Sequence, residues 1–325
     1  MMAGQIYIQV GLILILTACM SVAGSQPELK PVTVQLAWSH SAQFAGFYAA
    51  DQKGYYAQEG LVVAFIEGGP QVDRLPAVLQ GQAQFGISGA TELFAARAEG
   101  QPVRAVAVIL RRDPFAFFAL AESGIVRPED FVGRTIQVRM RARPILHAIT
   151  NRVRIEPEQY TERHEAAFED LFEGEVDVAT GFITSELPAA KRLGYQLNVI
   201  HPDDYGVHFY TDIIVTTDAL IAAEPDLVAR FLRASFKGWT YAVEHPAEAG
   251  ALVAPYNPEA DVELENDTML ASLPLINTGE DHIGWMKPQI WTGMAETLRQ
   301  QTVLTTPVDI EEVYTMQFLQ EIYGE

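Results

Sequence analysis

Hydrophobic positions in the first part of the chain change from the spacing of a strand to that of a helix and back. Residues 32–38 form a run of β-branched and apolar side chains that predicts a short buried strand. Between Phe44 and Tyr48 the apolar residues have helical spacing, and Gly54 is placed to end that helix. Residues 61–66 predict a second strand. Strand, helix and strand in this order predict a right-handed βαβ unit of a parallel sheet.

Strands and helices continue to alternate further along the chain. The apolar runs 85–87 and 103–110 predict buried parallel strands. We expect the chain to leave a first lobe at the extended residues 116–120 and to return at residues 208–216. The predicted fold class is therefore α/β, with two lobes joined by two crossovers, each lobe a mainly parallel sheet flanked by helices. Because domain closure is absorbed by a few residues at element ends, the crossovers are the expected hinge.

The later part of the chain, after Asp218, is mostly helical. Its longest helical pattern carries an apolar stripe between Leu227 and Trp239, which suits packing on the first lobe.

Charge narrows the range of partners. The 325 residues contain 42 Asp and Glu against 22 Lys and Arg, a formal net charge of −20. No basic stripe is present, so nucleic acid is not an expected partner. The same charge opposes electrostatic recruitment to an anionic lipid surface, so any membrane attachment has to be covalent or apolar.

Six sequence stretches carry a family resemblance. They are WSHSAQFAGFY at Trp38–Tyr48, KGYYAQEGL at Lys53–Leu61, GGPQVD at Gly68–Asp73, GQAQFGISGATE at Gly81–Glu92, AARAEGQPV at Ala95–Val103 and HPDDYGVHFYTDIIVTT at His201–Thr217. Together they resemble substrate-binding proteins related to the yeast-type thiamin-pyrimidine synthases, whose bacterial members serve ABC importers. The resemblance covers most of the mature chain. One departure is the charged turn at 139–144, where the family usually has a glycine-rich turn.

The resemblance implies a type II periplasmic-binding-protein-like fold with the ligand between two closing lobes. Residues 31–117 and 213–325 would form lobe 1, and residues 118–212 would form lobe 2. The implied partners are a small-molecule vitamin, the permease and ATPase subunits of an ABC importer, and a membrane reached through a lipid anchor. We expect a monomer.

The N-terminus supplies that anchor. Residues 11–18 form an apolar run that is shorter than the roughly 20 residues of a membrane span but has the length of a signal-peptide core. Leu16–Cys19 resembles a bacterial lipobox, which predicts a signal peptide over 1–18, a lipidated Cys19 and a tether over 19–30 on the outer face of the cell membrane. The alternative is a signal peptide cut elsewhere, because residues 1–10 lack Lys and Arg. Cys19 is the only cysteine, so no disulfide or cysteine nucleophile is expected.

Aromatic residues fall near several predicted strand ends and crossovers, where they could sandwich a flat ring. The alternative is that most of them belong to the core, and we expect about half to contact ligand. The candidates are Trp38, Phe44, Tyr48, Phe117, Tyr205 and Tyr210, with Phe182 beside them.

Short polar side chains occupy the same loops, as a polar heteroaromatic ligand requires. The candidates are Ser39, Gln43, Ser88, Thr91, Thr180 and Glu186. Ser88 and Thr91 could instead cap a helix, and Glu186 could be a solvated carboxylate at a helix start. Asp212 is expected to accept a hydrogen bond that locks the hinge.

Arg139, Arg141 and Arg143 could bind a phosphate, but we favour the interpretation that they face solvent or surface carboxylates. The seven histidines show no metal-binding spacing, and the sequence lacks a phosphate-binding loop and a serine nucleophile elbow. We therefore expect no metal, no cofactor and no catalytic residues.

The sequence favours a binding protein that delivers riboflavin to an ABC importer, with a thiamin pyrimidine precursor as the alternative ligand. Riboflavin is preferred because a tricyclic ring would use more of the aromatic residues. An enzyme like the eukaryotic thiamin-pyrimidine synthases is disfavoured, because those use a cysteine-rich iron segment and Cys19 would be lipidated. A sensor ectodomain is a third possibility that would need a separate signalling partner.

Overall fold

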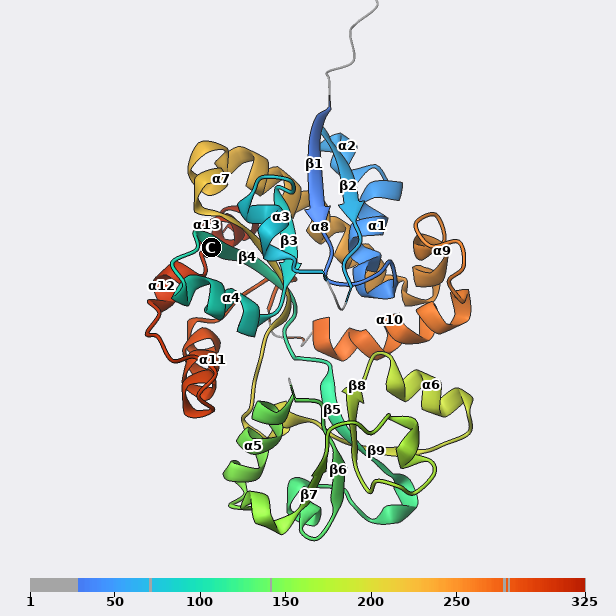
Figure 1. Cartoon of the computed structure of the whole chain (residues 1–325). Coiled ribbons are helices and arrows are strands. Elements are labelled where there is room, and N and C mark those ends of the chain that lie inside the picture. The colour runs from blue at the N-terminus through green and yellow to red at the C-terminus, as the bar shows by residue number, and fades with distance from the viewer. Residues whose placement is uncertain (1–28, 70–71, 141, 277–278, 280, 325) are drawn as a thin grey trace, which may run out of the picture.

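The computed structural model describes residues 29–69, 72–140, 142–276, 279 and 281–324. Figure 1 shows two lobes, one above the other, joined where the chain crosses between them. The N-terminal βαβ unit is present in the upper lobe, which we call lobe 1. Strand β1 (Lys30–Gln35) pairs in parallel with β2 (Leu61–Ile66), and helices α1 (Ala45–Gln52) and α2 (Tyr55–Gln58) lie between them in sequence. Gly54 adopts φ +71°, a left-handed conformation that ends α1.

Lobe 1 contains a five-stranded sheet in the order β2-β1-β3-β10-β4. Helix α3 (Leu75–Leu79) precedes strand β3 (Phe85–Ser88). Helix α4 (Ala90–Ala98) lies between β3 and strand β4 (Val103–Leu110) in sequence. Strand β10 (Thr211–Thr217) runs antiparallel to both of its neighbours. The sheet is therefore mainly parallel, with the returning strand as the exception.

The C-terminal helices complete lobe 1. They are α7 (Asp218–Ala223), α8 (Pro225–Glu244), α9 (Ala249–Val253), α10 (Val262–Ile276), α11 (Pro288–Gln300), α12 (Ile310–Val313) and α13 (Gln317–Tyr323). Helix α8 packs on α1, and the predicted stripe from Leu227 to Trp239 is buried there. The two helices approach closely at glycines: a Cβ on Gly238 would lie 2.1 Å from the backbone oxygen of Gly46.

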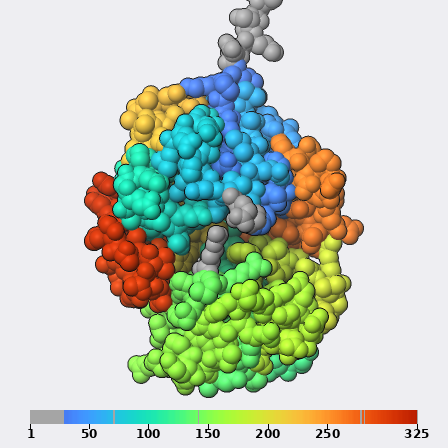
Figure 2. Space-filling view, viewed as in Figure 1, coloured from blue at the N-terminus to red at the C-terminus, as the bar shows by residue number. Residues whose placement is uncertain are grey.

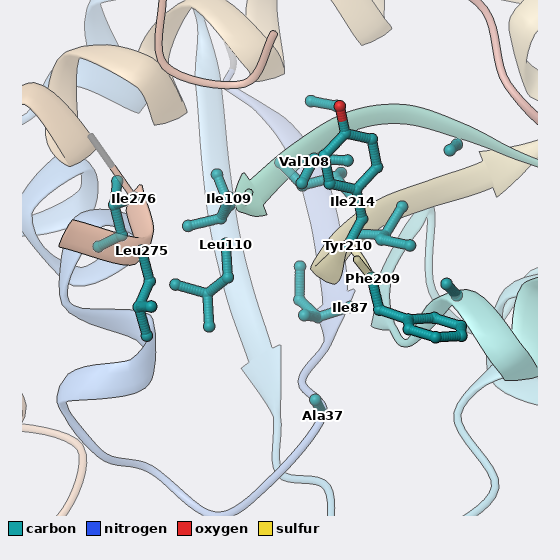
Figure 3. Close-up of a cluster of buried hydrophobic side chains, with 14 of the residues drawn as sticks. Ala37, Ile87, Val108, Ile109, Leu110, Phe209, Tyr210, Ile214, Leu275 and Ile276 are labelled. Atoms are coloured by element: carbon teal, nitrogen blue, oxygen red, sulfur yellow. The ribbon is translucent and has the colours of Figure 1, made fainter. Parts of the chain in front are cut away.

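The core of lobe 1 reaches the level of the crossovers. Figure 3 shows side chains from β3, β4 and β10 meeting Leu275 and Ile276 of α10 and the crossover residues Phe209 and Tyr210. All of these residues are buried. The hydrophobic core therefore anchors the second crossover directly.

Lobe 2 repeats the pattern of lobe 1 with different strands. Strand β5 (Phe115–Leu120) pairs antiparallel with β8 (Ala179–Phe182) and β9 (Leu197–Ile200). Strand β6 (Thr135–Gln137) pairs in parallel with β7 (Thr161–Arg163) and bridges to β8 through Ile136 and Val178. Helices α5 (Arg143–Arg152) and α6 (Glu186–Arg192) flank these strands. In each lobe the antiparallel strand is the one by which the chain enters from the other lobe.

One predicted boundary differs from the structure. Residues 116–120 lie within β5, which pairs only with strands of lobe 2 among the described residues. The first crossover therefore lies at 111–114, before the expected position. The extended pattern at 116–120 belongs to a strand of lobe 2, and the connection to that strand lies just before it.

Candidate functional site

The carboxyl ends of the parallel strands in both lobes face the boundary between the lobes. Strand β4 ends at Leu110, and the chain enters lobe 2 at Phe115. Strand β9 ends at Ile200, and the chain returns to lobe 1 at Thr211. Because β1 and β3 run parallel to β4, and β6 and β8 run parallel to β9, their carboxyl ends lie at the same two edges. Figure 2 shows the surface hollowed between the lobes. Ligands of open α/β sheets bind at such edges.

The loop after β1 presents an exposed tryptophan at the lobe 1 edge. The side chain of Trp38 is 47% exposed, and Ser39 beside it is exposed too. The Trp38 carbonyl accepts a hydrogen bond from the Gly68 amide at 2.9 Å, which ties this loop to the loop after β2. A Cβ on Gly68 would lie 2.4 Å from the Leu36 carbonyl oxygen, so only glycine permits this approach.

Lobe 2 presents its own exposed ring at the facing edge. Phe182 ends β8 and is 47% exposed, and it packs edge-on against Phe115, with ring centroids 6.3 Å apart. Trp38 and Phe182 thus offer one accessible aromatic face from each lobe. Two such faces suit a flat, apolar ring between them.

Charged and polar side chains gather at the carboxyl end of β3. The Ser88 hydroxyl donates to Oε2 of Glu92 at 3.0 Å, and Arg74 forms an ion pair with the same carboxylate. Thr91, one residue before, is exposed. Nε of Arg74 is buried and has no hydrogen-bond partner among the described residues. Sequence reasoning did not single out Arg74, because an isolated arginine after an irregular loop carries no pattern.

Asp212 lies at the start of β10, next to Ser88 in the sheet through the Ile213–Ser88 pairing. Its Oδ1 accepts a hydrogen bond from the Gln43 side-chain amide at 2.8 Å, while its buried Oδ2 has no partner among the residues that the structure describes. Burial raises the pKa of Asp212 to about 7, against the opposing effect of the Gln43 hydrogen bond. Its φ of +50° is rare for a residue other than glycine. Such strain is concentrated at functional sites.

Three of the predicted aromatic contacts belong to the core in this structure. Phe44, Tyr48 and Phe117 are fully buried. Tyr48 stacks on Tyr256 with centroids 4.1 Å apart, and its hydroxyl shares a 2.6 Å hydrogen bond with Nδ1 of His40. These positions have the helical or alternating spacing that core and site residues share, so spacing alone could not separate the two.

Four other candidates have protein partners. Thr180 donates both its amide and its hydroxyl to Oε1 of Gln137, at 2.8 and 3.0 Å. Glu186 accepts the amide of Phe182 at 2.8 Å and the Ser185 hydroxyl, so its carboxylate closes the turn before α6. The buried Tyr210 accepts the Lys287 amide at 3.0 Å.

Tyr205, the fourth, packs in part against the core, in the short helical turn Pro202–Tyr205. Burial raises its pKa, as do the nearby charges of Glu129 and Asp204. Glu129 belongs to the 3-10 helix Pro128–Phe131 of lobe 2, so Tyr205 lies near charged groups of that lobe.

The three arginines of the charged turn do not form one cluster among the described residues. Arg143 forms an ion pair with Glu162 at 2.7 Å, as the interpretation of surface pairing expects. Arg139 is exposed and makes no ion pair within the described part of the chain. Arg141 lies outside the described residues. Within that part, no phosphate-binding trio is formed.

A polar cluster that the sequence analysis missed joins the two crossovers. The guanidinium of Arg112, in the first crossover, lies 2.6 Å from Asp203 and 2.6 Å from Asp204 of the second, and donates to Nδ1 of His201 at 2.9 Å. His201 donates in turn to the Asp113 carbonyl at 2.7 Å. The contacts join residues about 90 apart in sequence, which no local pattern can reveal.

His201, Asp203 and Asp204 have the composition of a metal site, with ligand atoms within 4.8 Å of one another. The Arg112 guanidinium already contacts all three side chains. A metal ion at this position would have to displace the Arg112 guanidinium. We therefore interpret the cluster as a structural contact that joins the two crossovers.

The chain matches the model of the family described as NMT1/THI5 like over residues 41–249. The chain belongs to the NMT1/THI5-like family. It is 29% identical to a riboflavin-binding protein of Chloroflexus aurantiacus, over 91% of this chain and 88% of the relative. It is 27% identical to a formylaminopyrimidine-binding protein of Halalkalibacterium halodurans, over 93% and 95%.

The chain is also similar to a protein named as a synthase. A 4-amino-5-hydroxymethyl-2-methylpyrimidine phosphate synthase of Legionella pneumophila is 25% identical over 89% of this chain and 92% of the relative. Among solved structures, the periplasmic aliphatic sulphonate binding protein of Escherichia coli superposes with a TM-score of 0.68 at 14% identity, covering 88% of this chain and 91% of that one. The predicted periplasmic-binding-protein fold is therefore confirmed.

No helix among the described residues is long and apolar enough to cross a membrane. The predicted signal peptide, Cys19 and most of the tether lie outside the described residues, so these stay predictions.

Proposed function

We propose that this protein is an extracytoplasmic solute-binding protein that captures riboflavin between its two lobes and delivers it to an ABC importer. The observation that carries the proposal is the pair of exposed rings, Trp38 and Phe182, one on the facing edge of each lobe. A planar tricycle stacked between them would bury both rings only when the lobes close. Binding and closure would then be coupled, as delivery to a permease requires.

The polar groups near the carboxyl end of β3 support a ligand with hydrogen-bonding edges. Asp212 keeps one carboxyl oxygen without a partner among the described residues, and so does Nε of Arg74. Buried groups of this kind are costly unless a ligand or water satisfies them. The isoalloxazine ring carries both N–H and C=O groups on one edge, so it could satisfy a donor and an acceptor at once. The riboflavin-binding relative adds support from sequence.

The second candidate is a thiamin pyrimidine precursor for the same kind of importer. The formylaminopyrimidine-binding relative, which this chain matches over nearly its whole length, favours it. A single pyrimidine ring would also pair with Asp212 through its amino group. It would cover less of the two exposed rings than a tricycle, which is why riboflavin is preferred.

An enzymatic role receives less support. The resemblance to the eukaryotic thiamin-pyrimidine synthases implies a cysteine-rich iron segment for an enzyme of that kind, and this chain has one cysteine, which the lipobox assigns to an anchor. We propose that Cys19 carries that lipid on the outer face of the cell membrane. Globomycin treatment with mass analysis of the N-terminal peptide tests the anchor: an unlipidated Cys19 would contradict it.

The decisive experiment for the ligand starts with the protein purified without its first 19 residues. Denaturation should release a compound with a flavin absorption spectrum, and the emptied protein should quench flavin fluorescence on titration with riboflavin. Tight binding of formylaminopyrimidine with no flavin response would transfer the assignment to the second candidate. Binding of neither would contradict both.

A further inference from the structure

A cavity of about 190 Å³ lies beside the cleft, where both lobes and the second crossover meet. Lobe 1 contributes the start of α4 and the end of α11, and lobe 2 contributes the start of α5. The volume equals that of roughly six water molecules, so a short substituent or a single small ring fits. Because its walls come from both lobes, the cavity exists only when the lobes are close together.

The lining has more hydrogen-bonding groups than its protein contacts use. The Thr91 hydroxyl and the Gln301 amide line the cavity and make no side-chain hydrogen bond within the described residues. A free amide supplies both donors and an acceptor, and a free hydroxyl supplies one of each. Ile145 on the opposite wall gives the cavity an apolar side.

Two carboxylates determine the charge that this cavity accepts. Glu92 is held by Ser88 and Arg74, and Asp113 accepts the Thr211 hydroxyl at 2.5 Å and the Phe115 amide at 2.8 Å. Each carboxylate has further lone pairs for a ligand hydroxyl. An anionic group would be repelled by the Asp113 carboxylate, which has no cationic partner among the described residues, and an apolar chain would leave the free Thr91 and Gln301 groups without partners.

We propose that this cavity binds a neutral polyhydroxylated chain attached to the flat ring in the cleft, with Thr91, Glu92, Asp113 and Gln301 as its hydrogen-bonding groups. The inference rests on the proposed function, and it specifies which part of a riboflavin molecule each region of the site recognises. The ring would lie in the cleft near Trp38, and the five-carbon ribityl chain would enter the cavity. A chain that contacts both α4 and α5 would also favour closure of the lobes.

The test compares ligands that share one ring and differ in the chain. Riboflavin, lumiflavin, which has a methyl group in place of the chain, and the 5′-phosphate of riboflavin are titrated into the emptied wild-type protein by fluorescence quenching. The expected result is an affinity for riboflavin roughly tenfold or more above that for lumiflavin, since several hydrogen bonds are lost together. The phosphate should bind more weakly than riboflavin.

A double variant locates the effect. Thr91→Val with Gln301→Leu removes the two free polar groups at nearly constant size, and the ratio of riboflavin to lumiflavin affinity should fall towards one. The matched control is Thr292→Val with Gln300→Leu, because Thr292 and Gln300 lie on α11, are exposed and are absent from the cavity lining. The control should keep the wild-type ratio.

The outcomes separate the two proposals. Equal affinities for riboflavin and lumiflavin in the wild-type protein would overturn the chain site while leaving ring binding intact. Tighter binding of the phosphate would also overturn it, because the Asp113 carboxylate would not be excluding an anion. If neither flavin binds, the proposed function fails and this inference fails with it.

Discussion

Gln43 donates a hydrogen bond of 2.8 Å to Asp212, and this contact joins the turn after β1 to the strand that returns from lobe 2. The two residues are 169 positions apart in sequence. Because Asp212 is buried with a left-handed backbone, the Gln43 amide is the described group that holds its carboxyl in place.

The raised pKa of Asp212 predicts a pH dependence of stability. The carboxyl has a pKa of about 7 in the folded protein and an ordinary value of 3.8 when exposed. Between these values the folded state keeps a proton that the unfolded state releases, so the free energy of unfolding falls as pH rises from 4 to 7. The slope from this group approaches about 1.4 kcal/mol per pH unit. Urea unfolding of wild type and Asp212→Asn across this range checks it, since the variant should lose that part of the slope.

Removing the Gln43 amide should destabilise the protein. Gln43→Leu leaves Oδ1 of Asp212 as a second buried acceptor without a partner, at a cost of about 1–3 kcal/mol in the free energy of unfolding. Gln43→Glu is the informative comparison, because one proton shared by two carboxyls can restore the hydrogen bond at low pH. Unfolding curves should therefore show Gln43→Glu to be more stable than Gln43→Leu at pH 5 and less stable at pH 8, where two ionised carboxylates would repel each other. Identical curves for Gln43→Leu and wild type would refute the role of this contact.

Truncation of the exposed rings should weaken ligand binding, whereas truncation of a buried ring should lower the stability of the protein. Trp38→Ala and Phe182→Ala should each weaken ligand binding by about tenfold, with little change in the melting temperature of the ligand-free protein, because each ring is 47% exposed. Phe117→Ala should instead lower the free energy of unfolding by about 3–5 kcal/mol, since its ring is fully buried. Calorimetry of ligand-free protein and titration with riboflavin make the comparison. A large loss of ligand-free stability in Trp38→Ala would assign that ring to the core.

The close approach of α1 and α8 predicts a steric requirement at Gly238. A Cβ there would lie 2.1 Å from the Gly46 carbonyl oxygen, so Gly238→Ala should separate the helices and cost at least about 1–3 kcal/mol. Gly293→Ala on α11 is the matched control, because a Cβ at that position meets nothing within 4 Å. The control should stabilise the protein by up to about 1 kcal/mol through helix propensity. Equal effects of the two substitutions on urea unfolding would contradict the packing argument.

The Arg112 cluster predicts that metal ions leave the crossovers unaffected. Adding zinc or EDTA should not change the melting temperature of the wild-type protein, since the guanidinium contacts His201, Asp203 and Asp204. Arg112→Ala should lower the melting temperature, because two carboxylates lose their partner, and zinc should restore part of the loss. A zinc-dependent rise in the wild type would show that the arginine does not block the site.

Local patterns were enough to predict most of the fold, because most strands of lobe 1 are visible in the sequence as apolar runs. The run 61–66 is a strand of lobe 1, but it lies at the sheet edge and alternates between buried and exposed residues. The runs 85–87 and 103–110 are apolar because these strands are covered on both faces, and each is also a strand of lobe 1. The same property misled the site prediction at Phe44, Tyr48 and Phe117, since burial and ligand contact demand the same side chains. Arg74, Arg112 and Asp113 could not be found, because their roles come from partners distant in sequence.

The insertion of β10 between β3 and β4 has a consequence for how the chain acquires its structure. Lobe 2 is a continuous segment, so its strands β5 to β9 can assemble as soon as residues 115–200 are available. Lobe 1 has to wait for residue 211 and beyond, and until then β3 and β4 present unpaired edges to other chains. If the chain is exported from its N-terminus, lobe 1 emerges first but can be completed only after residue 211 has crossed the membrane. A chaperone that shields strand edges would act on residues 85–110 until then.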